Sequence, residues 1–180
     1  MMKADLFARQ TRENDAERSS SVSKYSDGWP AARPVQGGRL TVMKICPSCY
    51  AVCVDQHWLF DEKVRAKGEK ERSKKELCPG CDRVVKGRVD GVVHLKGDFL
   101  AKHKDEAKHL ISNVAERKLR KNIAARICHF EEKEDEIVIE TTDKALAERL
   151  GKEFEKAYSG TLDIQWPQAD SFARVYWQRD

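Results

Sequence analysis

The spacing of apolar and polar residues divides this chain into an irregular start and a patterned remainder. Residues 1–40 show no apolar periodicity and are rich in Ser, Arg, Asp, Gly and Pro. Such a segment buries too little surface to offset the entropy lost on ordering, so the sequence predicts a disordered N-terminal arm. Residues 41–46 then read as a short strand, and the apolar positions of residues 52–60 predict a strand of a hairpin.

The second half of the chain alternates between the two apolar periods, two for strands and 3.6 for helices. We expect Asp98 to cap the first helix and Thr141 or Thr142 to cap the second, because short oxygen-bearing side chains accept the free N–H groups of a first turn. The predicted elements are a strand at 88–96, a helix at 99–121, strands at 123–130 and 136–141, a helix at 143–158, and strands at 161–166 and 171–177.

This order predicts an α+β fold. Its first six elements match the split β-α-β arrangement of a ferredoxin-like βαββαβ domain, with two helices on one antiparallel sheet. The seventh element is expected as an appended edge strand. The predicted organisation is therefore a disordered arm (1–40), a four-cysteine zinc ribbon with a basic insertion (41–88), and a ferredoxin-like domain (89–180).

Four of the six cysteines form two pairs, Cys46-Pro-Ser-Cys49 and Cys78-Pro-Gly-Cys81. Each pair resembles a zinc knuckle, in which a tight turn with a small residue before the second cysteine directs two thiolates at one metal ion. Two knuckles supply a tetrahedral shell of four sulfur atoms, which is typical of structural zinc. The sequence therefore predicts one structural Zn²⁺, although the same shell also accommodates iron.

A closed four-sulfur shell leaves no position for water or substrate, so the metal is expected to stabilise the fold and not to catalyse. The chain also lacks the short motifs of nucleotide-binding, hydrolytic and metalloprotease sites. We therefore expect a protein that is not an enzyme and has no small-molecule substrate. No segment has the roughly 18 apolar residues needed to span a bilayer, and the charged N-terminus lacks a signal sequence, so a cytoplasmic location is expected.

Charge is distributed unevenly about a net value of +4. Residues 1–129 hold 27 Lys/Arg against 17 Asp/Glu, whereas residues 130–180 hold 7 against 13. A basic front half suits a polyanion such as structured RNA. The candidate RNA-binding residues lie in the insertion between the cysteine pairs, around the second pair and along the first predicted helix: Lys63, Arg65, Lys67, Lys70, Arg72, Lys74, Lys75, Arg83, Lys86, Arg88, Lys102, Lys104, Lys108, Arg117, Lys118, Arg120 and Lys121.

Three motifs together carry a family resemblance: CPSC followed by CPGC, then LKGDFLAKHKDEAKHLISN, then TTDKALAERLGKEFEKAYSGTL. In this order, over residues 41–178, the chain resembles bacterial relatives of the nonsense-mediated-decay protein 3 family. Larger members of that family carry further cysteine pairs and β-rich domains that this chain lacks. The resemblance implies binding to the large ribosomal subunit or its RNA through the zinc-bearing region, with a role in ribosome stability, maturation or translation control.

A second hypothesis stays open from the sequence. The same zinc module could serve a protein-interaction or regulatory adaptor that does not bind RNA directly, and a protein partner is compatible with the acidic second half.

Overall fold

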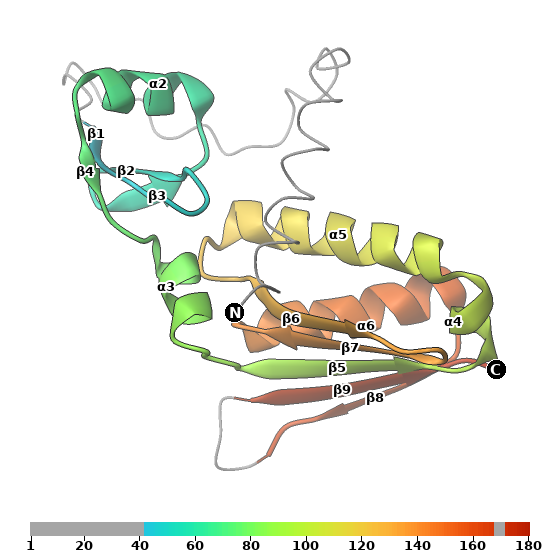
Figure 1. The fold of residues 1–180 in the computed structure, drawn as a ribbon. Helices are drawn as coiled ribbons and strands as arrows, with labels where there is room; N and C mark the ends of the chain where they lie inside the picture. Colours follow the sequence, from blue (N-terminus) through green and yellow to red (C-terminus); the bar gives the residue numbers. More distant parts are fainter. Residues whose placement is uncertain (1–41, 168–171) are drawn as a thin grey trace.

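The computed structural model describes residues 42–167 and 172–180 of the 180-residue chain. These residues form a mixed α+β structure with two sheets and five helices (Figure 1). The smaller sheet lies with the four paired cysteines in residues 42–88, and the larger sheet comes from the rest of the chain. The predicted disordered arm, 1–40, lies outside the described residues.

The small sheet has the order β3-β2-β1-β4. Its strands are β1 (Val42–Ile45), β2 (Val52–Val54), β3 (His57–Leu59) and β4 (Lys74–Lys75). The single strand predicted over 52–60 is in fact two strands. Asp55 and Gln56 adopt positive φ angles of 48° and 67°, and two such residues in succession make the tight turn that joins antiparallel strands.

The basic insertion between the cysteine pairs is an ordered excursion from this sheet. Helix α2 (Glu62–Lys70) begins at Asp61, whose Oδ1 accepts the N–H of Val64 at 2.9 Å. Val64 and the buried Gly68 face the sheet, and the helix packs against β1 and β2. The chain then returns along β4, which pairs in parallel with β1. We call residues 62–75 the basic excursion.

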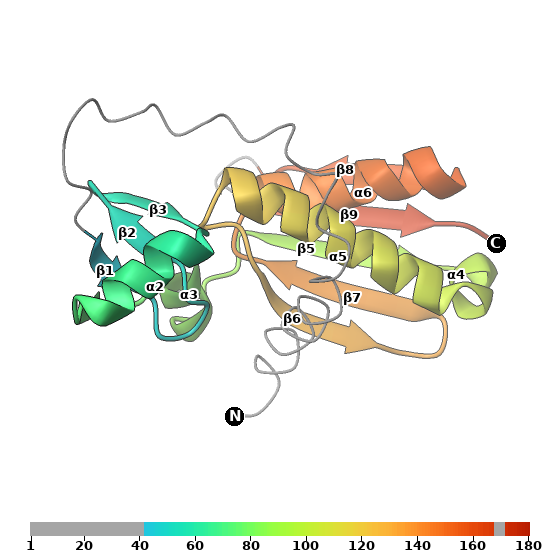
Figure 2. The ribbon, with the colours of Figure 1, turned by 90° about the horizontal axis from the view of Figure 1, so that it is seen from above.

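The large sheet has the order β6-β7-β5-β9-β8. Its strands are β5 (Gly91–Lys96), β6 (Ile127–Glu132), β7 (Glu136–Thr141), β8 (Thr161–Gln165) and β9 (Ala173–Gln178). Helices α5 (Lys104–Lys121) and α6 (Lys144–Tyr158) cover one face of it (Figure 2). Residues of β5, β7 and β9 that point toward these helices are buried, and they form the main core with the apolar stripes of α5 and α6.

The order of this sheet departs from the ferredoxin-like expectation at one edge. The final strand was expected at the edge, but β9 lies inside the sheet, parallel to β5, and β8 forms the edge. Side-chain character explains the exchange. Strand β9 buries Ala173, Val175 and Trp177 completely or nearly so, whereas β8 carries only partly buried or exposed residues and suits an edge.

The helix predicted over 99–121 is divided in two. Helix α4 (Asp98–Lys102) is followed by α5, and His103 interrupts them with φ −123° and ψ 32°. The ring of His103 stacks on Phe99, with centroids 4.3 Å apart. The predicted cap was also wrong: Gly97 occupies the N-cap position with φ 113°, and Asp98 is the first helical residue.

The cap of α6 also differs from the prediction, and it lies after Thr141 and Thr142. The side chain of Asp143 accepts the N–H of Ala145, so Asp143 is the N-cap. Thr141 and Thr142 are fully buried instead. The hydroxyl of Thr142 donates to the carbonyl of Ala124 at 2.6 Å and accepts the N–H of Arg126 at 2.9 Å. This contact ties the start of α6 to the turn that precedes β6, and β6 begins at Ile127, later than the predicted start at residue 123.

None of the helices within 42–167 and 172–180 has both the length and the apolar character required to cross a membrane.

Candidate metal centre

Two turns of different construction bring the four cysteines together. In the first, the N–H of Cys46 donates to the carbonyl of Ala51 at 2.8 Å, and the N–H of Tyr50 returns to the carbonyl of Cys46 at 3.0 Å. In the second, Cys78 is the N-cap of helix α3 (Pro79–Val85), and its Sγ accepts the N–H of Cys81 at 3.5 Å. Each cysteine pair is therefore arranged by local backbone hydrogen bonds.

The four sulfur atoms are close enough to share one metal ion. All four Sγ atoms lie within 4.8 Å of one another, and those of Cys49 and Cys78 are 3.6 Å apart. In a tetrahedral site with zinc–sulfur bonds of about 2.3 Å, neighbouring sulfur atoms lie about 3.8 Å apart. The predicted set of Cys46, Cys49, Cys78 and Cys81 is thus compatible with a single zinc site.

The four thiols of this cluster lie together in a largely buried site and hydrogen-bond to one another. Cys46, Cys78 and Cys81 are buried and Cys49 is partly buried, with Trp58 and Leu77 packed against them. Hydrogen bonds from Cys49 and the other two thiols lower the pKa of Cys46. The same hydrogen bond raises the pKa of Cys49, which keeps its proton. A divalent cation would replace those protons, so metal binding is expected to release them and to weaken in acid.

The second half of the chain contributes a cation to this centre. Arg126 precedes β6, and its Nη2 lies 3.5 Å from Cys49 Sγ and 3.7 Å from Cys78 Sγ. Its guanidinium also lies over the ring of Phe60, 5.7 Å from the centroid. The other terminal nitrogen, Nη1, is buried and has no hydrogen-bond partner among the described residues. Sequence reasoning missed Arg126, because it lies far beyond the cysteine pairs at no ligand-like spacing.

Close backbone approach holds the second knuckle against the large domain. A Cβ atom on Gly80 would lie 2.2 Å from the carbonyl oxygen of Ile123. The glycine of the Cys-Pro-Gly-Cys motif is therefore required by this contact with the turn before β6. Ile123 itself packs against the cysteine cluster. Arg83, in α3, adds hydrogen bonds of 2.6 Å to Asp90 and to the carbonyl of Thr142.

The two remaining cysteines do not join the cluster in the described part of the chain. Cys53 lies in β2 and is only 4% exposed. Cys128 lies in β6 and is partly buried, and this burial raises its pKa to about 11. A protonated thiol of this kind is a poor metal ligand and a poor nucleophile.

The seventeen candidate RNA-binding cations divide into two groups. Ten have a carboxylate oxygen within 4.0 Å. These paired residues are Arg65, Lys67, Lys74, Arg83, Lys86, Lys104, Lys108, Arg117, Lys118 and Arg120. The cations of α5 in particular face acidic residues of its neighbours, as Lys108 faces Glu132 of β6 at 2.8 Å. The α5 surface is therefore less basic than its sequence indicates.

The other seven candidates are exposed and have no carboxylate partner among the described residues: Lys63, Lys70, Arg72, Lys75, Arg88, Lys102 and Lys121. The first four belong to the basic excursion. Lys102 and Lys121 lie near opposite ends of α5, an 18-residue helix about 27 Å long. Four of the seven candidates without a carboxylate partner thus lie on the basic excursion, and the other three are scattered.

Comparison with family models, with curated proteins and with solved structures finds no match for this chain.

Proposed function

We propose that this chain is a zinc-stabilised protein, not an enzyme, that binds the ribosome through structured RNA. Its contact surface is the basic excursion, and the zinc centre serves to hold that excursion in place. The proposed location is the cytoplasm.

The observation that carries this proposal is the pairing state of the cations. Lys63, Lys70, Arg72 and Lys75 are exposed and lack a carboxylate partner among the described residues, although acidic residues are abundant in the chain. An unpaired lysine or arginine is free to exchange its counterion for a phosphate, which is the main source of affinity for RNA. A protein that needed these charges only for solubility would not need them gathered on one short excursion.

The metal centre supports a scaffolding role. Its four sulfur atoms would fill a tetrahedral shell, so no site remains for a reacting group. The ions most compatible with this shell are zinc and, as an alternative, iron. The excursion begins after one cysteine pair and ends at the other, so a bound metal would close it as a loop. The chain's own residues then present the cations in a fixed arrangement, which lowers the entropic cost of binding.

The family resemblance supplies the target. The motif order of the two cysteine pairs and the Thr141–Gly160 segment is similar to that of bacterial relatives of the nonsense-mediated-decay protein 3 family. We therefore take the large ribosomal subunit as the first partner to test, with ribosome stability, maturation or translation control as the process served.

The test is co-sedimentation of the zinc-loaded full chain with purified ribosomal subunits at low and moderate salt. We expect binding at about 50 mM salt that weakens steeply by about 200 mM, as phosphate contacts do. A variant with Lys63, Lys70, Arg72 and Lys75 changed to glutamine should lose most of this binding. The matched control changes four cations outside the excursion to glutamine, with the same loss of net charge: Lys133, Lys144, Lys152 and Lys156.

Two results would oppose the proposal. Absence of ribosome binding at low salt would refute the proposal. Equal losses of ribosome binding in the two variants would show that net charge alone is responsible for it. A protein partner that stays bound after nuclease treatment, together with no ribosome binding, would favour the adaptor hypothesis instead.

A further inference from the structure

The face of the large sheet turned away from α5 and α6 carries a hollow of about 690 Å³. Along β5 and β9, buried residues under the helices alternate with more exposed ones on this open face: Val93 and Leu95 are buried, and His94 between them is not. The volume is in the range of about 300–1,000 Å³ that small-molecule and cofactor sites occupy. The hollow is separate from the metal centre and from the basic excursion.

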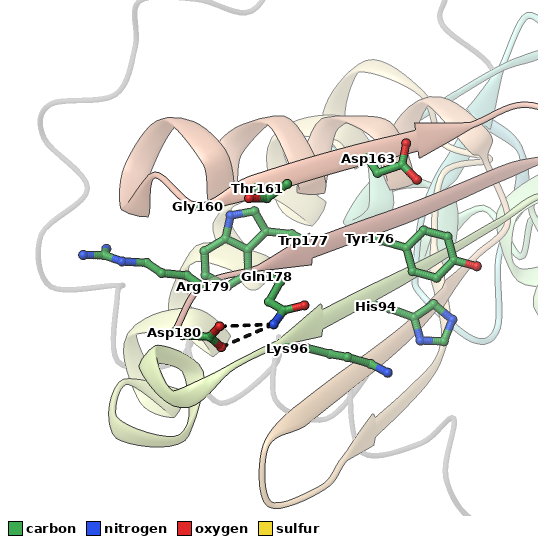
Figure 3. A pocket seen from close by; sticks show the side chains of 10 residues that line it. All are labelled: His94, Lys96, Gly160, Thr161, Asp163, Tyr176, Trp177, Gln178, Arg179 and Asp180. Atoms are coloured by element: carbon green, nitrogen blue, oxygen red, sulfur yellow. Dashed lines mark hydrogen bonds between the residues drawn. The ribbon is translucent and has the colours of Figure 1, made fainter.

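Strand register arranges six of the lining side chains in two rows across β5, β9 and β8 (Figure 3). The rows are His94, Tyr176 and Asp163, and then Lys96, Gln178 and Thr161. The open face therefore presents one aromatic centre with polar groups on its sides, and this pattern comes from alternate positions of three paired strands.

The centre of the hollow is an exposed aromatic platform. The rings of Tyr176 and His94 lie 5.1 Å apart between centroids, with an angle of 11° between their planes. Tyr176 is 37% exposed, and none of the described helices covers it. Glu136 fixes the imidazole, since its Oε1 lies 2.9 Å from His94 Nδ1. A ring held rigidly on a sheet surface offers its π-face to a nucleobase, and every base can stack there.

Polar groups suited to a nucleotide surround this platform. The carboxylate of Asp163 can accept hydrogen bonds from a base edge, and the amide of Gln178 and the hydroxyl of Thr161 can both donate and accept. Two cations lie on the same face on opposite sides of the row of His94 and Tyr176: Lys96 in the row of Gln178, and Arg174 in the next row on the other side. No carboxylate lies within 4.0 Å of the Arg174 guanidinium among the described residues.

The acidic groups near the platform are partly neutralised. Glu136 is shared by His94, Lys96 at 3.3 Å and Lys133 at 3.7 Å. The carboxylates of Asp163 and Asp180 keep their charge, because each accepts hydrogen bonds from a neutral amide and neither has a cationic partner among the described residues. A phosphate chain on this face would therefore have to follow Lys96 and Arg174 and stay away from Asp163.

We propose that this hollow binds single-stranded RNA, with one base stacked on Tyr176 and the backbone phosphates near Lys96 and Arg174. The inference deepens the proposed function, since RNA is the ligand in both, and it assigns a second contact surface on the other part of the chain. The basic excursion binds phosphates of structured RNA, whereas the open sheet face receives an unpaired segment.

The test uses the full, zinc-loaded chain and fluorescein-labelled oligouridylate and oligoadenylate of about eight nucleotides, a length within the usual site size of such surfaces. Binding is measured by fluorescence anisotropy at about 50 mM salt. We expect Tyr176→Ala to weaken binding at least about ten-fold, as removal of a stacking platform does, and Tyr176→Phe to keep most of the affinity. Trp166→Ala is the matched control, because Trp166 is an exposed aromatic residue of the same domain outside the hollow.

Thermal unfolding of each variant shows whether the fold is retained. Tyr176 lies on the face away from the main core, so its replacement should leave the midpoint nearly unchanged. If Tyr176→Ala fails to fold, Tyr176→Phe still tests the proposal. Ultraviolet irradiation of its complex with RNA should form an adduct on the peptide that contains residue 176.

Three outcomes would overturn this assignment. The first is that Tyr176→Ala and the unchanged chain bind the oligonucleotides with equal affinity, and the second is that the adduct forms only on other peptides. The third is that no oligonucleotide binds at up to about 100 μM protein, a concentration at which even non-specific phosphate contacts are detected. Ribosome binding without oligonucleotide binding would remove this site and leave the proposed function standing. If Tyr176→Ala then also lost the ribosome, the ligand of the open face would be a protein and not RNA.

Discussion

Replacing Arg126 with alanine removes the one cation that the second half of the chain directs at the cysteine cluster in the described structure. Nη2 of Arg126 donates toward the sulfur atoms of Cys49 and Cys78 at 3.5 and 3.7 Å. With zinc bound, four thiolates carry a net negative charge that a neighbouring guanidinium compensates. We therefore expect Arg126→Ala to bind zinc more weakly.

The size of this effect follows from two opposing contributions. Loss of a partner that holds a metal ligand costs about 10–100-fold in affinity, or about 1.4–2.7 kcal/mol. The contacts of Arg126 to sulfur are long, and its Nη1 is buried without a partner, so the alanine variant also relieves an unsatisfied donor. The second contribution reduces the first, and we expect a loss of about ten-fold, at the lower end of that range.

Competition between the zinc-loaded chain and a chromophoric chelator measures this affinity directly. Arg126→Lys keeps the positive charge but replaces the planar fork with a point charge, so it should fall between the alanine variant and the unchanged chain. Arg149→Ala is the matched control, because Arg149 is an exposed arginine of α6 that pairs with Glu153. Unchanged zinc affinity in Arg126→Ala would refute the reasoning.

Three further predictions test other parts of the structure. Zinc removal by a chelator should unfold residues 42–88 and leave the cooperative transition of the large domain, as hydrogen exchange read by mass spectrometry would show; protection retained in both parts would contradict this. Gly80→Ala should lower the free energy of unfolding by about 1–3 kcal/mol in denaturant, because the new Cβ meets the Ile123 carbonyl. Gly87→Ala is the control, because its Cβ meets nothing within 4 Å. Its expected cost of about 1–2 kcal/mol comes from the positive φ alone. The hydrogen bond from His94 lowers the pKa of Glu136 below its ordinary value of 4.5. The stability that the ionised Glu136 carboxylate contributes is therefore present above pH 4.5, and it is lost as the pH falls through the lowered pKa. Glu136→Gln should therefore destabilise the large domain by about 1 kcal/mol at pH 7, and the variant should lose less stability in acid than the unchanged chain. Urea unfolding across about pH 3–7 measures both effects. An unchanged dependence of stability on acid would count against this prediction.

Features encoded by neighbouring residues could be predicted from the sequence. The cysteine cluster is of this kind, because each pair is arranged by hydrogen bonds within its own turn. Strand β7 and helix α6 are others, since Ile137 and Ile139 alternate with polar residues, and Leu146, Leu150 and Phe154 recur at helical spacing. In these segments the local period and the burial seen in the structure agree.

Features that depend on residues distant in the chain could not be predicted from the sequence. Thr142 has the chemistry of a helix cap, but it is buried against the turn before β6 and bonds to Ala124 and Arg126, so the next residue caps α6. The interior place of β9 depends on its pairing with β5, more than seventy residues earlier in the chain. The role of Arg126 has the same origin, since only the folded chain brings it to the sulfur atoms. Tertiary contacts overrode the local preference in each case.

The cysteine cluster consequently does more than join its own two turns. Ile123 packs on the cluster, Arg126 reaches its sulfur atoms, and Gly80 allows the backbones to meet, so the contact of residues 42–88 with the rest of the chain depends on the shape of this cluster. The basic excursion and the open sheet face are thereby held at a set separation. If one RNA engages both surfaces, the second contact is intramolecular, and its effective concentration depends on how rigidly this junction is held. Zinc would then contribute to RNA affinity through the junction, without any contact to RNA.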